Sequence, residues 1–93
     1  MINDRAISDI RRELEDAQRS FTRAKNTIAQ SRSQLADFVL ANAALIAEGN
    51  KIDLSAYEEA IQEAEWDREC AVRSFQEARE RMINLANGLS LFD

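Results

Sequence analysis

The stretch LIAEGNKIDL, residues 45–54, separates two long series of regularly spaced apolar residues. Gly49 or Asn50 suits the left-handed conformation that often ends a helix. Asp53 or Ser55 suits the N-cap of a following helix, and Ser55 with Glu58 has the spacing of a capping box. The sequence therefore predicts two helices joined by a short turn. We place the first helix at 4–48, the turn at 49–53 and the second helix at 54–87.

Both series advance in alternating steps of three and four residues, which is the period of a coiled coil. The only polar members of the first series are Ser31 and Asn42, and the only charged member of the second is Arg68. The first series is Ile7, Ile10, Leu14, Ala17, Phe21, Ala24, Ile28, Ser31, Leu35, Phe38, Asn42 and Leu45; the second is Leu54, Tyr57, Ile61, Ala64, Arg68, Ala71, Phe75, Ala78, Met82, Leu85, Leu89 and Phe92. The expected fold is all-α: a long antiparallel two-helix hairpin, coiled-coil-like, in one domain spanning 1–93 with a short apolar tail at 88–93.

Folding the chain back at the turn also predicts a register. If Leu45 pairs with Leu54, the numbers of facing residues sum to 99. Ser31 then faces Arg68, and Asn42 faces Tyr57. Several other layers place a large side chain against an alanine, an alternation that fills an interior at native density.

Composition excludes several classes of partner. The chain has 93 residues, a net charge of −5 and a pI near 4.7, so we expect no direct binding to nucleic acid or to anionic membranes. The uncharged run 38–47 is about half the roughly 20 residues needed to span a bilayer. One cysteine allows no internal disulfide, and the first residues contain no apolar signal segment. A cytoplasmic location is expected.

The residue types that carry most enzyme chemistry are missing. The sequence contains no histidine, the commonest general base and metal ligand, and no glycine-rich phosphate loop. Acidic pairs such as Glu59 and Glu63, four residues apart, are expected to be solvated on a helix face. We therefore expect no enzymatic activity, no cofactor and no metal site.

The first helix is apolar on almost every side near the turn, and a helix of this kind is normally buried. A two-helix rod buries only one stripe per helix. We therefore expect self-association, as a homodimer resembling a four-helix bundle, and a second protein docked at this end. The segment from Asp37 to Glu69 has a net charge of −7, which predicts a partner with a basic surface. The candidate partner-binding residues are Val39, Leu40, Ala43, Ile46, Ala47 and Trp66, ringed by Glu58, Glu59, Glu63 and Glu65.

The expected function is thus that of a non-enzymatic protein–protein interaction module, of the adaptor or inhibitor type. One alternative is a phage-type inhibitor whose acidic face competes with nucleic acid for a basic groove, in counter-defence or replication. Another is a purely structural self-assembling hairpin.

A third alternative follows from the tail, where Leu89-Ser90-Leu91-Phe92 resembles the second half of the linear motif by which bacterial proteins bind the DNA sliding clamp. Gly88 stands where that motif has glutamine. The resemblance implies that Leu89, Leu91 and Phe92 would enter an apolar pocket of the clamp.

Overall fold

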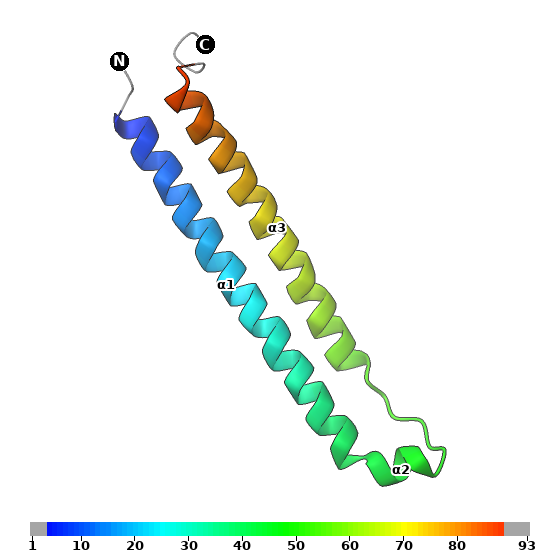
Figure 1. Ribbon diagram of the computed structural model, residues 1–93. Coiled ribbons are helices and arrows are strands. Elements are labelled where there is room, and N and C mark those ends of the chain that lie inside the picture. Colours follow the sequence, from blue (N-terminus) through cyan, green and yellow to red (C-terminus); the bar gives the residue numbers. More distant parts are fainter. Residues whose placement is uncertain (1–3, 89–93) are drawn as a thin grey trace.

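The computed structural model describes residues 4–88 and contains helices α1 (Asp4–Ala41), α2 (Ala43–Ala47) and α3 (Ser55–Ala86). α1 and α3 run antiparallel side by side, and α2 lies at the end of the rod where the chain reverses (Figure 1). The molecule measures 71 × 16 × 15 Å. No strand occurs between residues 4 and 88. The predicted all-α class and the hairpin shape are confirmed.

The core is a narrow line of small side chains between α1 and α3. All the buried residues of the described chain belong to the two apolar series. They are Ile10, Ala17, Ala24, Ile28 and Ser31 on α1, and Ala64, Ala71, Ala78 and Leu85 on α3. Except for Ile28, they recur every seven residues on their helix. Because the distance between packed helices depends on the side chains at the contact, rows of alanine and serine bring the two backbones close together.

The predicted register is wrong by about one helical turn. The rings of Phe38 and Tyr57 lie 5.3 Å apart between centroids, so the numbers of these two residues sum to 95. Ion pairs from Arg32 to Glu65 and from Arg81 to Glu13 give sums of 97 and 94. A shift of about four residues from the predicted 99 corresponds to roughly 6 Å along the helix axis.

This register changes which side chains face each other. With a sum of 95, Ala24 lies level with Ala71, and Ser31 lies level with Ala64 rather than with Arg68. Between Ala17 and Ser31, the predicted alternation of large and small residues is replaced by small residues matched with small ones, whereas Ile10 lies level with Leu85. The pattern of threes and fours fits both registers, because a shift of one turn brings another seam position of the partner helix opposite each residue.

α1 ends at Ala41 and does not continue to residue 48. Asn42 has φ −108° and ψ 16°, and its side-chain Nδ2 donates a hydrogen bond to the carbonyl oxygen of Phe38 at 2.9 Å. The backbone N–H of Asn42 is shared between the carbonyls of Phe38 and Val39, each at 3.2 Å. Asparagine side chains compete in this way for helical carbonyl groups. The chain consequently bends at Asn42, and α2 points away from the axis of α1 (Figure 1).

The turn uses the residues that the sequence singled out. Gly49 has φ +88°, and its N–H donates to the carbonyl of Ile46 at 3.0 Å. The N–H of Asn50 donates to the carbonyl of Leu45 at 3.0 Å, which completes a Schellman motif at the end of α2. The Ser55–Glu58 capping box is not formed, because Leu54 occupies the N-cap position without a side-chain hydrogen bond. Of the predicted tail, 88–93, only Gly88 lies within the described residues, and the clamp-like segment 89–92 lies outside them.

Asp53 supplies the capping oxygen of α3 instead. Its Oδ1 accepts hydrogen bonds from the hydroxyl of Ser55 at 2.6 Å and from the backbone N–H of Ser55 at 3.0 Å. These two bonds lower the pKa of the Asp53 carboxyl below its usual value, the hydroxyl contributing most. The negative charge also lies next to the positive end of the helix dipole.

We predict that Asp53→Ala lowers the melting temperature at pH 7. Because the folded-state pKa is lowered, the carboxylate contributes stability above its usual pKa and loses it as the pH falls through the lowered value. Thermal melts followed by circular dichroism should therefore show a wild-type advantage at pH 7 that shrinks in acid. Asp53→Asn is the control, since it keeps an acceptor oxygen that does not titrate. A wild-type advantage over alanine that stays constant from pH 7 to pH 2 would contradict this role.

We also predict that Ala71→Leu destabilises the hairpin by about 1–3 kcal/mol, the usual cost of overfilling a packed core. Ala71 is buried in the α3 row, whereas Ala56 is exposed on the same helix. Ala56→Leu is therefore a matched control with the same added volume. Urea denaturation measures both. Equal stability of the two variants would show that the alanine row is not tightly packed.

Candidate functional site

The predicted partner-binding residues lie on all three helices. Val39 and Leu40 lie in the last turn of α1, and Ala43, Ile46 and Ala47 belong to α2. Except for the half-buried Val39, these five are exposed. The four glutamates and Trp66 lie on α3.

We call residues 39–54, from the last turn of α1 to the start of α3, the tip. Three of the seven large exposed hydrophobic residues in the described chain belong to it: Leu40 at 72% exposure, Leu45 at 46% and Ile46 at 41%. These three fall within seven consecutive residues. Single exposed apolar residues are normal on a protein surface, but a cluster of this kind commonly marks a contact site.

The bend at Asn42 is what creates this cluster. The sequence placed Leu45 on the buried seam, opposite Leu54, but the bend carries Leu45 away from α3 and leaves it nearly half exposed. The signal was present in the sequence, since Asn42 is a polar residue in an otherwise apolar run. The apolar series predicts a paired seam position for Asn42, but its side chain bonds to its own helix.

Acidic residues surround the tip. Asp37, Glu48, Asp53, Glu58 and Glu59 are all exposed there, and Lys51 is the only basic residue between positions 37 and 59. Glu58 and Glu59 lie at the start of α3, which packs against α1 and not against α2. The tip combines apolar side chains with a negative border.

The remaining predicted residues lie farther from the tip. Trp66 is level with about residue 29 of α1, roughly 16 Å along the rod from Leu40. Its side chain is 58% exposed and lies two positions after the buried Ala64, so it faces away from α1. Glu65 forms an ion pair with Arg32 across the two helices at 3.4 Å. Glu63 and these two residues are therefore not part of one compact surface with α2.

The two long sides of the hairpin differ in chemistry. Apolar side chains four positions after the buried rows, or after Tyr57, lie on one side together with Val72, which directly follows the buried Ala71; we call this side the apolar flank. It comprises Leu14, Phe21, Ile28 and Leu35 from α1, and Ile61, Val72, Phe75 and Met82 from α3. Phe75 is 42% exposed although the sequence placed it in the core. In the observed register Phe75 lies level with Phe21, and two rings cannot both enter the narrow seam.

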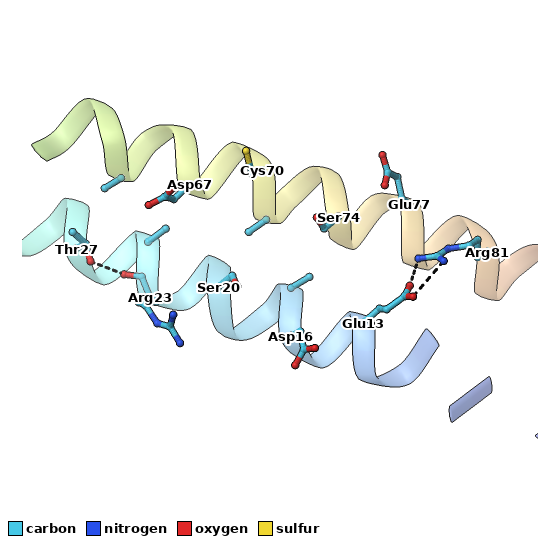
Figure 2. Close-up of a pocket in the computed structure, with 14 residues that line it drawn as sticks. Glu13, Asp16, Ser20, Arg23, Thr27, Asp67, Cys70, Ser74, Glu77 and Arg81 are labelled. Atoms are coloured by element: carbon cyan, nitrogen blue, oxygen red, sulfur yellow. Dashed lines mark hydrogen bonds and ion pairs between the residues drawn. The ribbon is translucent and has the colours of Figure 1, made fainter. Parts of the chain in front are cut away.

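The opposite side forms a shallow groove of about 590 Å³. Alanines from both helices form its floor, and Ser20, Ser74 and Cys70 lie along it (Figure 2). The ion pair between Glu13 and Arg81 crosses one end. Thr27 does not offer its hydroxyl proton to the groove, because Oγ1 donates to the carbonyl of Arg23 at 3.0 Å.

The groove shows no arrangement that demands a ligand. Among residues 4–88, no three Cys, Asp or Glu side chains lie close enough together to share a metal ion. Within the same range, no buried side-chain polar atom lacks a hydrogen-bond partner. The groove is thus a polar, water-accessible side of the rod.

Comparisons with known proteins add no family to this description: no family model, curated protein or solved structure matches the chain. Among the helices between residues 4 and 88, none has the length and apolar character needed to cross a bilayer.

Proposed function

We propose that this chain is a non-enzymatic protein–protein interaction module that docks another protein through its tip. The observation that carries the proposal is the exposure of Leu40, Leu45 and Ile46 at the end of a rod. Their apolar surface lies in water in the free chain, and contact with an apolar pocket would remove it from water at roughly 25 cal/mol per Å².

The shape of the tip favours binding because the short helix α2 is held at both ends. The Asn42 side chain bonds to Phe38 where α2 begins, and the Schellman hydrogen bonds of Gly49 and Asn50 close its end. A surface that is already ordered loses less conformational entropy when it binds. Ile46 lies on α2 between these two fixed points.

The charge at the tip indicates the chemistry of the partner. Asp37, Glu48 and Asp53 are exposed in or beside the tip, Glu58 and Glu59 are exposed at the start of α3, and Lys51 is the only basic residue between positions 37 and 59. A complementary surface would have an apolar pocket bordered by lysine or arginine, and opposite charge would speed its association. Such a complex weakens as salt shortens the Debye length.

We predict that Ile46→Glu abolishes capture of the partner. The test is affinity capture with the tagged full chain, quantified by mass spectrometry and repeated at two salt concentrations. Ile83→Glu is a matched control, since Ile83 is 43% exposed and Ile46 is 41% exposed, but Ile83 lies at the far end of α3. A protein held by the wild type and by the Ile83 variant, lost by the Ile46 variant and released by added salt is the expected result. Equal capture by both variants would rule out the tip.

An inhibitory form of the same function has its own structural support. Glu59, Glu63 and Asp67 are exposed four residues apart along one face of α3, so they extend the negative border of the tip along the rod. If the captured partner is a nucleic-acid-binding protein, duplex DNA should displace the chain from it. A partner that binds DNA and the chain at the same time would contradict inhibition by occupation of a basic groove.

The sliding-clamp alternative depends on residues 89–92, which lie outside the described residues. Deleting 89–93 tests it separately, because that deletion leaves α2 and its acidic border intact. Loss of capture on deletion, with no effect of Ile46→Glu, would favour the tail over the tip.

A further inference from the structure

The isolated hairpin buries very little. Most of its buried residues are alanines, and the most deeply buried residue of the described chain, Ala78, is one of them. No large side chain is fully buried in that range. A chain of this size with so thin a core normally gains stability from a disulfide, a metal or another subunit. The single cysteine, Cys70, cannot form a disulfide within the chain.

The hairpin exposes more surface to solvent than a compact protein of the same mass. The chain has a solvent-accessible surface of 7297 Å², whereas compact monomers of its 10.6 kDa mass expose about 5,500 Å². The excess is about 1,800 Å² per chain, which exceeds the roughly 800 Å² that each partner buries in a standard interface and matches an obligate one. The tip alone does not supply this area, because only three of its side chains, Leu40, Leu45 and Ile46, are large, apolar and exposed.

Of the four exposed large hydrophobic residues that the described chain has outside the tip, Val72 and Phe75 lie on the apolar flank, whereas Trp66 and Ile83 do not. The apolar flank has its widest continuous part in the half of the rod away from the tip, at Leu14, Phe21, Val72, Phe75 and Met82, which we call the flank patch. The ion pair between Arg32 and Glu65 and the half-buried Arg68 interrupt the flank toward the tip. The opposite side, the groove, is polar.

We propose that a second copy of this chain covers the flank patch, so that two hairpins form a four-helix bundle with the grooves outside. The occupant is a second copy because one pairing buries the patch of both chains, and an isologous contact closes without leaving a free patch. Two flank patches also supply the large side chains that the alanine seam lacks, so the dimer gains the core that each hairpin is missing. This proposal is independent of partner docking at the tip, which lies at the end of the rod.

The test is sedimentation equilibrium of the full chain over a wide concentration range, combined with thermal melts at the same concentrations. The expected result is twice the chain mass and a melting temperature that rises with concentration, as mass action requires. A monomer at every concentration with a constant melting temperature would overturn the proposal. So would a mass that grows beyond two chains, which indicates open-ended contact between the tip of one copy and the flank of another.

Adjacent substitutions locate the interface. Phe75→Glu should weaken dimerisation by roughly tenfold or more, since it places a charge in the centre of the contact. Ser74→Glu introduces the same group one residue away, on the groove side, and should leave the dimer unchanged. The reverse pattern, or no difference between the two, would contradict the assignment.

The concentration dependence of the wild-type mass and melting temperature tests dimerisation even if the Phe75 variant does not fold. Ile46→Glu should dimerise normally, so failure of tip docking and failure of dimerisation are separate results.

Discussion

The packing of small side chains along the seam sets how closely the two long helices approach and which large side chains stay exposed. Ala17, Ala24 and Ser31 on α1 lie level with Ala78, Ala71 and Ala64 on α3, and all six are buried. Rows of this kind let two helices approach closely, so little room remains between them for larger residues. Large members of the apolar series such as Phe21, Phe75 and Met82 therefore lie on one flank, where water still reaches them.

This arrangement relates the fold to the surfaces available for binding. A hairpin that fills its seam with alanine gains a well-defined register but a small hydrophobic contribution, because each buried alanine removes little apolar area from water. Much of the remaining apolar area lies on the flank patch and the tip, and Trp66 and Ile83 are exposed elsewhere on α3. The flank patch and the tip lie in different parts of the rod, and they have different borders. A chain with two such surfaces can bind a second copy through one of them and still present the other.

Much of the fold could be predicted from the sequence, because the signals are periodic and local. The alternating threes and fours gave both long helices, and Gly49 marked the end of α2 with a left-handed residue. The register could not be predicted, since the same periodicity is satisfied by sums of 95 and 99. The contact between Phe38 and Tyr57 and the ion pair between Glu13 and Arg81 distinguish them. The tip was predicted in composition but not in shape, because the hydrogen bond from Asn42 to its own helix is invisible in a pattern of apolar residues.

The close packing of the two small-residue rows is tested most directly by a cysteine pair across the seam. In a Cys70→Ala background, Ala24→Cys combined with Ala71→Cys should form an intramolecular disulfide on mild oxidation, because residues that face each other across a close seam approach the Cα separation of about 4.4–6.8 Å that a disulfide requires. Ala24→Cys combined with Phe75→Cys, the pair that a sum of 99 would bring together, should remain reduced within one chain. Efficient closure of the 24–75 pair in place of the 24–71 pair, measured by mass spectrometry of the monomeric band on a non-reducing gel, would contradict the account.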